Sequence, residues 1–253
     1  MKISLLDIKI IIVNVFSVDW INTIRLNSKL PWKIARYLPI WVYKCKIYKL
    51  EGKIEIDSDY IKVGMIRLGQ NLTPLFHPSC GVTLSLSKGG LLAFKGPGMI
   101  GAGSAIEIGS SGNIVFGKNF GITATFRITS RMSITVGDNF SCAWDVNIFD
   151  TDFHEIYDIN EDKILDTEKS IKIGDDVWIC QRCLILKGAN IPRRSIIAAS
   201  SLVNKSLESD ISNTLYGGIP AKVIKRGITR QDFIDFESNN MLDITRGTRL
   251  KHL

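Results

Sequence analysis

The segment Ile173–Glu208 reads IGDDVW, ICQRCL, ILKGAN, IPRRSI, IAASSL and VNKSLE, a run of hexapeptides that each begin with Ile or Val. In the first five, the fifth residue is small or β-branched: Val177, Cys183, Ala189, Ser195 and Ser201. A period of six matches neither the 3.6 residues of a helical turn nor the two-residue alternation of a strand. It is typical of a short strand followed by a corner, wound into parallel coils that stack through backbone hydrogen bonds. We therefore predict a mainly β chain that forms a parallel β-helix of hexapeptide repeats.

The same pattern extends toward the N-terminus with imperfect phase. Tetrapeptides that join a strand to a corner recur as IEIG (106–109), IVFG (114–117), ITVG (134–137) and IKIG (171–174). Residues 155–170 break the repeat and contain six acidic residues and two lysines, which predicts a solvated loop that projects from the coil wall. Residues 51–90 are predicted as looser β coils. The predicted β-helix domain is therefore 51–226, with regular coils between about 90 and 207.

Residues 1–50 are predicted as a helical, amphipathic segment. After a start at Ser28 and Pro31, apolar residues follow helical spacing, with Pro39 in the middle. These apolar residues are Leu30, Ile34, Tyr37, Leu38, Trp41, Val42 and Cys45. We interpret the segment as a cap over the open end of the β-helix, and the alternative is a peripheral membrane contact, because basic residues lie among the apolar ones. Residues 227–253 are predicted as a short helix from Thr229 followed by a tail.

Composition excludes several classes of protein. The chain has 253 residues, of which 45% are hydrophobic, so it can bury a sizeable core and is not generally disordered. Its net charge of +7, concentrated in residues 1–50 and 171–226, favours an anionic partner. The sequence contains no P-loop, no GxGxxG after a strand and no basic run interleaved with stacking aromatic residues. Nucleoside-triphosphate chemistry and nucleic-acid binding are therefore not predicted.

Cysteine content and hydropathy bear on location. Five cysteines, an odd number in a chain of this size, favour reduced thiols over a disulfide framework. The apolar N-terminus is interrupted by Asp7 and Lys9, and no small-residue cleavage site follows, which argues against a signal peptide. No stretch reaches eighteen apolar residues. We expect a cytoplasmic protein, either soluble or at the inner face of the membrane.

Four segments carry a resemblance to a known family. They are DTDFH (Asp150–His154), IKIGDDVWI (Ile171–Ile179), IAASSLV (Ile197–Val203) and GGIPAKVIKR (Gly217–Arg226). In this order and spacing the chain resembles the hexapeptide-repeat acyltransferases, particularly the bacterial O-acetyltransferases that modify surface-polysaccharide sugars. The resemblance implies a left-handed coil, a homotrimer, and acetyl-CoA bound along the groove between neighbouring subunits. The left hand is implied by the resemblance alone, since general rules favour right-handed crossovers.

Acetyl transfer to a hydroxyl group requires a base, because an alcohol is a poor nucleophile until its proton is removed. Histidine suits this task, and only His154 lies in a dense motif, whereas His77 and His252 do not. Asp150, Asp152 and His154 are spaced by two, so an extended backbone would place them on one side. We predict His154 as the general base, oriented by Asp152 in preference to Asp150. No metal is predicted, because three convergent histidine ligands are not available.

The other candidate residues divide between the acceptor and the donor. Those assigned to the acceptor are Asn147, Asp150 and Trp178. The resemblance implies that Trp178 is a pocket wall that also contacts the acyl donor. Small side chains would let the thioester arm of acetyl-CoA approach the backbone closely: Ala198, Ala199, Ser200 and Ser201. The family often has glycine where Cys180 and Ser200 stand. Cations placed for the CoA phosphates are Lys205, Lys222, Lys225 and Arg226.

The function predicted from these features is acetyl-CoA-dependent O-acetylation of a sugar hydroxyl in the biosynthesis of O-antigen, capsule or exopolysaccharide. One alternative is N-acetylation of an amino sugar or another small acceptor. An alternative of a different class is a β-helix scaffold without catalytic activity.

Overall fold

The computed structural model describes residues 16–71, 73, 80–208 and 212–231. Within them, three sheets form the walls of a coil, which we call walls A, B and C, and we name each corner by the walls that it joins. Wall A contains β1 (Ile40–Val42), β4 (Ile66–Gln70), β7 (Gly98–Gly101), β10 (Phe120–Ile122), β13 (Ser141–Cys142), β18 (Trp178–Ile179), β21 (Ser195–Ile197), β23 (Thr214–Gly218) and β24 (Ala221–Arg226). Wall B contains β2 (Cys45–Leu50), β5 (Val82–Leu86), β8 (Ser104–Ile108), β11 (Arg127–Ser130), β14 (Asn147–Phe149), β19 (Leu184–Leu186) and β22 (Leu202–Val203). Wall C contains β3 (Lys53–Ile56), β6 (Leu91–Phe94), β9 (Asn113–Phe116), β12 (Ile134–Val136), β17 (Ile171–Ile173) and β20 (Asn190–Ile191).

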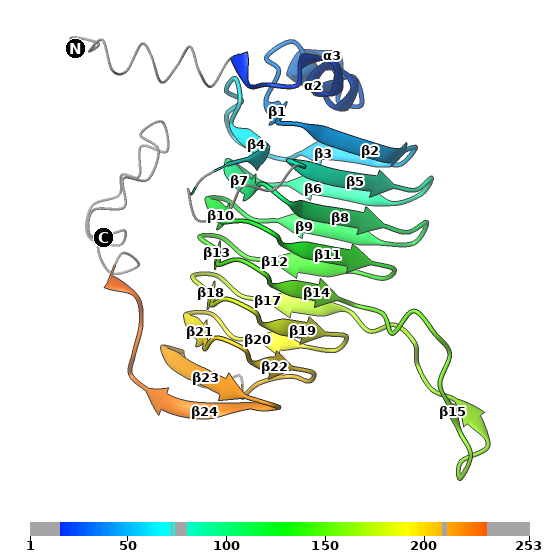
Figure 1. The fold of residues 1–253 in the computed structure, drawn as a ribbon, viewed down its shortest axis with the longest axis vertical. Coiled ribbons are helices and arrows are strands. Elements are labelled where there is room, and N and C mark those ends of the chain that lie inside the picture. Colours follow the sequence, from blue (N-terminus) through cyan, green and yellow to red (C-terminus); the bar gives the residue numbers. More distant parts are fainter. Residues whose placement is uncertain (1–15, 72, 74–79, 209–211, 232–253) are drawn as a thin grey trace.

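The chain passes from wall A to wall B to wall C and then begins the next coil. Neighbouring coils pair in parallel, so that Ile114, Ile134 and Ile171 occupy one column of wall C. In Figure 1 the strands of wall B cross the front of the molecule from left to right, and wall C returns behind them as the chain descends. The coil is therefore left-handed. The predicted mainly β, left-handed parallel β-helix is confirmed.

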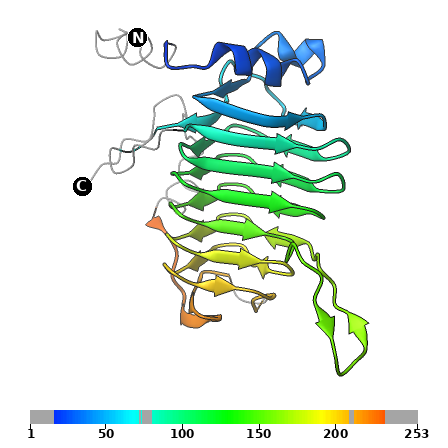
Figure 2. The same cartoon turned by 45° about the vertical axis from the view of Figure 1, so that its right-hand side comes forward.

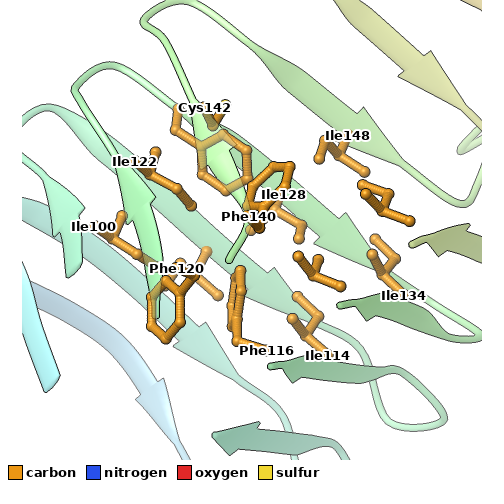
Figure 3. Packing of buried hydrophobic residues seen from close by; sticks show 14 of the residues in the cluster. Ile100, Ile114, Phe116, Phe120, Ile122, Ile128, Ile134, Phe140, Cys142 and Ile148 are labelled. Atoms are coloured by element: carbon orange, nitrogen blue, oxygen red, sulfur yellow. The ribbon is translucent and has the colours of Figure 1, made fainter. Parts of the chain in front are cut away.

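The interior of the coil is filled by the repeat positions from which it was predicted. The first-position residues from Ile173 to Val203 are all at most 1% exposed, and the small fifth-position residues are all at most 2% exposed. Figure 3 shows the upstream coils, where Ile and Phe side chains from successive strands pack into one core. The rings of Phe94, Phe116 and Phe120 stack with centroid separations of 4.8 to 5.9 Å. Many of the chain's isoleucine side chains therefore point into the core of the coil.

The fourth hexapeptide position forms the turn at each corner. These residues have left-handed backbone conformations: Asp176 (φ 56°), Arg182 (59°), Gly188 (79°), Arg194 (56°) and Ser200 (58°). A residue with a Cβ adopts this conformation at a cost of roughly 1 kcal/mol or more. Backbone hydrogen bonds to the preceding coil, such as Arg182 N–H to the Trp144 carbonyl (3.1 Å), hold these corners in place.

Two short helices, α2 (Trp20–Asn27) and α3 (Trp32–Ala35), cover the open end of the first coil (Figures 1 and 2). The side chain of Asn27 pairs with both backbone groups of Ile40, donating to its carbonyl (2.7 Å) and accepting from its N–H (3.2 Å). The Thr23 hydroxyl accepts a hydrogen bond from the Val42 N–H (3.2 Å). These contacts provide hydrogen-bond partners for the backbone groups at the free edge of β1, which could otherwise pair with a strand of another chain. The predicted helical cap is confirmed.

The helix predicted within this segment is wrong beyond Arg36. Ile40–Val42 forms β1 instead, and Ile40 pairs in register with Ile66 of the next coil. Pro39 disfavours a helical conformation for Leu38, whose φ is 45°. The first coil therefore begins at Ile40 and not at residue 51. The strands between 51 and 90 belong to the same three walls, with a register shift between Leu68 and Gln70 of β4.

At the C-terminal end, GGIPAKVIKR forms part of a hairpin and not a further coil. β23 continues wall A in parallel with β21, and β24 turns back antiparallel to β23. The following residues run back along wall A, where the Ile228 N–H donates to the Asn213 carbonyl (2.9 Å) and Arg230 lies over Trp178. Most of the helix and tail predicted from Thr229 lies in 232–253, outside the described residues.

Residues 155–170, which we call the excursion, leave the coil between β14 and β17. They contain a two-stranded antiparallel sheet of β15 (Tyr157–Asp158) and β16 (Lys163–Ile164). Figures 1 and 2 show this hairpin projecting well beyond the wall. An antiparallel bridge between Thr151 and Glu168 closes its base. Among the described residues, no helix has the length and hydrophobicity needed to cross a bilayer.

Candidate active site

Asp150, the first residue of the DTDFH motif, is fully buried just after β14, where the B–C corner begins. Its carboxylate accepts hydrogen bonds from the Ser130 hydroxyl (2.7 Å), the Arg131 N–H (2.7 Å) and the Met132 N–H (3.0 Å). These three donors belong to the same corner of the preceding coil. The carboxylate therefore ties two coils together and offers no surface to an acceptor, contrary to the acceptor-binding role predicted for it.

The predicted placement of Asp150, Asp152 and His154 on one side of an extended strand is wrong. Phe153 has a φ of 64°, in the left-handed region, and this interrupts the extended backbone. Its ring contacts that of Phe149 edge to face, with centroids 5.7 Å apart. As a result, Asp150 points into the coil, while His154 is exposed.

Asp152 is held by Lys187 of the next coil. Lys187 Nζ lies 2.5 Å from Asp152 Oδ2, and at least three quarters of each side chain is shielded from solvent. Lys187 Nζ also donates to the Asp166 carbonyl, while the Asp152 N–H donates to the Thr167 carbonyl (3.0 Å). Lys187 thus joins the coil wall to the base of the excursion. In the described part of the chain Asp152 makes no hydrogen bond to His154, so direct orientation of the imidazole by Asp152 is not seen.

His154 lies at the start of the excursion, at the B–C corner of the coil that contains β14. Its side chain is exposed, whereas the two aspartates that precede it in the motif, Asp150 and Asp152, are fixed by buried or shielded contacts. An exposed imidazole next to rigid supports can accept a proton from a bound molecule. His77 and His252 lie outside the described residues.

Trp178 belongs to a different face of the coil. It lies on β18 of wall A, next to Ile196 of β21, and its neighbour Ile179 points inward. The Arg230 guanidinium lies over the indole, 5.1 Å from the ring centroid, in a cation–π arrangement. Trp178 is thus partly covered by the segment that follows β24.

The small residues predicted for the donor lie at the A–B corner between β21 and β22. Ala199 and Ser200 are exposed, and Ser201 is buried. The Ser201 hydroxyl donates to the Ala198 carbonyl (2.7 Å) and accepts from the Gly218 N–H (3.2 Å), so it organises the corner and is not itself available to a ligand. The φ of Ser200, 58°, provides a physical reason for the glycine that the family often has at this position.

The cations predicted for phosphate binding lie beyond this corner. Lys205 is exposed after β22, and Lys222 and Lys225 are exposed on β24. Arg226 pairs with Glu208 (3.0 Å). Through the register Trp178–Ile196–Leu215–Lys225, Lys225 lies three strands from Trp178, or about 14 Å at the usual strand spacing.

The predicted site therefore forms two separate clusters in one chain. His154 and the Asp152–Lys187 pair lie at the B–C corner, while Trp178 and Ala198–Ser201 lie on wall A and at the A–B corner. Asn147 begins β14 at the A–B end of wall B, where its N–H donates to the Cys183 carbonyl (3.0 Å). It is about 10 Å along the strand from Asp150. Of the three residues predicted to bind the acceptor, Asn147 and Trp178 thus belong to the second cluster, and Asp150 lies apart from them.

The cysteines near this second cluster are not activated nucleophiles. Burial raises the pKa of the Cys180 thiol to about 11, and burial also raises the pKa of Cys183. Both residues are therefore protonated thiols at neutral pH, and a thiol is a much weaker nucleophile than a thiolate.

Two residues that contact the clusters could not be identified from sequence. Lys187 is the third residue of its hexapeptide, ILKGAN, and nothing in the repeat distinguishes it from a solvated lysine. Arg230 lies beyond the last motif, and only the return of the chain along wall A brings it to Trp178. Among the described residues, no three His, Cys, Asp or Glu side chains converge as metal ligands.

Replacing Lys187 with methionine is expected to loosen the base of the excursion. The change removes the partner of Asp152 and one donor to the Asp166 carbonyl. Loss of a charged hydrogen bond of this kind corresponds to about 1.4 kcal/mol, so hydrogen exchange at the Asp152 amide should accelerate about tenfold. In the Lys187→Arg variant, the Asp152 amide should exchange as slowly as in the unmodified protein, because arginine can keep the ion pair. The matched control is Lys169→Met, because the Lys169–Asp166 pair (3.2 Å) is exposed and contributes little. Equal exchange in all three variants would contradict the bridging role.

Comparisons with known proteins come from sequence and from structure. No family model matches the chain. It is 33% identical over 116 residues to the polysialic acid O-acetyltransferase of Escherichia coli O1:K1 / APEC, a match that covers 46% of this chain and 37% of that protein. It is 26% identical over 186 residues to a protein of Escherichia coli (strain K12) named for lipopolysaccharide biosynthesis O-acetyl transfer, covering 68% of this chain and 93% of that protein. The chain thus spans little more than a third of the first relative and nearly all of the second.

A solved structure is also similar. The hexapeptide-repeat containing acetyltransferase of Vibrio cholerae O1 biovar eltor, complexed with acetyl coenzyme A, is 26% identical. The match covers 48% of this chain and 64% of that chain, with a TM-score of 0.40.

Proposed function

We propose that the chain is a hexapeptide-repeat acyltransferase, as its similarity to both relatives supports, and that it is an acetyl-CoA-dependent O-acetyltransferase of a sugar hydroxyl in surface-polysaccharide biosynthesis. The observation that carries the proposal is the exposed His154, held at the base of the excursion within the DTDFH motif. The names of both relatives include a bacterial glycan, which supports a glycan acceptor. We also propose a cytoplasmic location, because acetyl-CoA is a metabolite of the cytoplasm.

In the proposed reaction, His154 takes the proton of the acceptor hydroxyl while the hydroxyl oxygen attacks the thioester carbonyl carbon. A carbon–oxygen bond forms, the carbon–sulfur bond breaks, and the sulfur leaves as CoA thiol after it receives the proton from His154. Backbone N–H groups at the A–B corner would stabilise the charge that develops on the carbonyl oxygen. The thioester arm of acetyl-CoA would lie against Trp178 and against the small side chains of Ala198–Ser200 at the A–B corner.

The phosphates of the donor require the cations beyond the corner. Three exposed lysines would contact them directly: Lys205, Lys222 and Lys225. Arg226 would leave its ion pair with Glu208 and bind a phosphate instead. Asn147 and Trp178 remain candidates for acceptor contacts, because both point outward near the A–B corner. The Asp150 carboxylate is buried and therefore does not contact the acceptor in the proposed site.

We further propose that each complete site forms between two copies of the chain in a homotrimer. His154 and the donor surface lie at different corners of the chain, because His154 follows β14 and Ala198–Ser200 follow β21, two coils further on, so the B–C corner of one copy must meet the A–B corner of its neighbour. The excursion supports this arrangement, because an isolated two-stranded hairpin is marginally stable in water and this one exposes several large apolar side chains. They are Ile156, Tyr157, Ile159, Ile164 and Leu165.

Complementation tests the shared site. His154→Ala removes the base, and Ala199→Trp fills the exposed corner proposed for the donor. Each variant alone is expected to be inactive. When the two are co-expressed, random assortment pairs an intact base with an intact corner at about a quarter of the interfaces, so about a quarter of wild-type activity should return. Separately purified variants that are mixed without subunit exchange provide the control. Absence of recovery in mixed trimers would overturn the shared site.

The activity itself is tested with purified protein, acetyl-CoA and a panel of nucleotide-linked and lipid-linked sugars. Release of CoA thiol should depend on the sugar, and the product should gain the mass of one acetyl ester, which mild base removes. A product that resists mild base would identify N-acetylation instead. No acceptor-dependent thiol release with any sugar would favour a scaffold and overturn the proposal.

A further inference from the structure

The outer face of the cap is apolar where a surface helix would ordinarily be polar. On α2, the face toward the first coil holds Thr23, Leu26 and Asn27, all buried. Ile21 and Ile24 lie on the opposite face and are 75% and 58% exposed. Helices that cover a protein core normally present polar side chains to water. Within the described residues, this outer face has no partner that would shield it.

Two further side chains enlarge this apolar surface at the same end of the molecule. Phe16 precedes α2 and is 83% exposed, and Trp32 begins α3 and is 79% exposed. Figures 1 and 2 show both helices beyond β1, at the end of the coil that is remote from the excursion. Large exposed apolar side chains gathered at one end mark an interaction site.

The cap is also strongly basic. Its basic residues are Arg25, Lys29, Lys33 and Arg36. The one acidic residue in 16–39 is Asp19, and its carboxylate faces inward, accepting from the Asn22 N–H (3.1 Å) and the Cys45 N–H (3.3 Å). Cations among aromatic and aliphatic side chains suit an anionic lipid surface, because the apolar groups enter the acyl boundary while the cations stay with the headgroups. A second copy of the cap carries the same charge and would be repelled.

We propose that the outer face of the cap, formed by Phe16, Ile21, Ile24 and Trp32 with the four basic residues, docks the protein on an anionic membrane. The inference does not depend on the proposed acetyl transfer. Along wall B, β14 is four strands from β2, which places it about 19 Å along the coil. Docking through the cap therefore leaves the corner that carries His154 clear of the membrane-facing end.

Sedimentation of the full chain with vesicles tests the docking. The unmodified protein should bind phosphatidylcholine vesicles that contain about one third phosphatidylglycerol, and bind much less to phosphatidylcholine alone. Each cation near an anionic bilayer strengthens binding about fivefold, so Arg25→Gln, Lys33→Gln and Arg36→Gln together should weaken binding about a hundredfold. Ile21→Ser, Ile24→Ser and Trp32→Ser together should weaken it more than tenfold, because the apolar contact is lost.

A control with the same loss of charge separates the cap from the overall charge of the protein. Lys118→Gln, Lys172→Gln and Arg193→Gln together remove three cations that line a groove on the coil wall, and vesicle binding should then change little. Equal loss in this control, or undiminished binding of the cap variants, would overturn the proposal. So would a fall in oligomer mass caused by the apolar substitutions, because the cap face would then join copies of the chain.

Discussion

Replacing His154 with alanine is expected to lower kcat for acetyl transfer about 10²–10⁴-fold, because a hydroxyl nucleophile then has no base to remove its proton. The KM for acetyl-CoA should remain within about twofold, since His154 is proposed to act on the acceptor hydroxyl, whereas the A–B corner of the neighbouring copy is proposed to hold the donor. Initial rates of thiol release with the acceptor found in the sugar panel measure both quantities.

Two further variants sharpen this test. His154→Gln keeps a polar side chain of similar reach but cannot take up the proton, so its loss of kcat should match that of the alanine variant. His252→Ala removes a histidine outside the motifs and should leave the rate unchanged. A His154→Ala protein that releases thiol at the unmodified rate, with the acceptor acetylated, would exclude His154 as the base.

Replacing Asp150 with alanine is expected to lower the free energy of unfolding by about 3–5 kcal/mol, because it removes the buried carboxylate that accepts from three donors and leaves two backbone N–H groups without an acceptor, while the Ser130 hydroxyl keeps the Asn113 carbonyl (3.2 Å). The donors are the Ser130 hydroxyl and the N–H groups of Arg131 and Met132. A loss of this size is a large fraction of the stability of an ordinary domain. Urea unfolding followed by tryptophan fluorescence at one fixed protein concentration measures it.

The matched control is Asp57→Ala, since Asp57 is exposed and its substitution should change stability by about 0.5 kcal/mol or less. Asp150→Asn keeps one acceptor oxygen and should cost roughly half as much as Asp150→Ala. If Asp150→Ala unfolded like the unmodified protein and instead raised the KM for the sugar, Asp150 would be an acceptor-binding residue after all, and its assigned role as a link between coils would be wrong.

From the DTDFH motif, the sequence predicts the location of the histidine but not the relative positions of the three polar side chains. The motif located the base of the excursion and the histidine, because both depend on residues adjacent in the chain. The spacing of two suggested a shared face, but that inference assumed an extended backbone, and the left-handed conformation of Phe153 separates the three side chains. The partner of Asp152 is Lys187, 35 positions along the chain, and only the stacking of one coil on the next brings them together.

The N-terminal segment shows a conflict of a different kind. Helical spacing continued from Leu30 to Cys45, yet the strand at Ile40–Val42 forms because its backbone can pair with β4. Periodicity describes which side chains can share a face, while pairing with a neighbouring coil decides whether the backbone is helical or extended. Pro39 marks the boundary between the two, and its effect on the preceding residue is local.

The sequence by itself determined the β-helix, since a six-residue period with an aliphatic first position and a small fifth position can be buried only by stacking equal coils. It also located the excursion, the cap and the candidate base. The tertiary structure alone decided that Asp150 is a buried link, that Lys187 holds Asp152, and that the two halves of the candidate site lie at different corners. The physical reason is that a repeat specifies which residues point inward along one strand. The angle at each corner and the stacking of coils set distances between residues far apart in the chain.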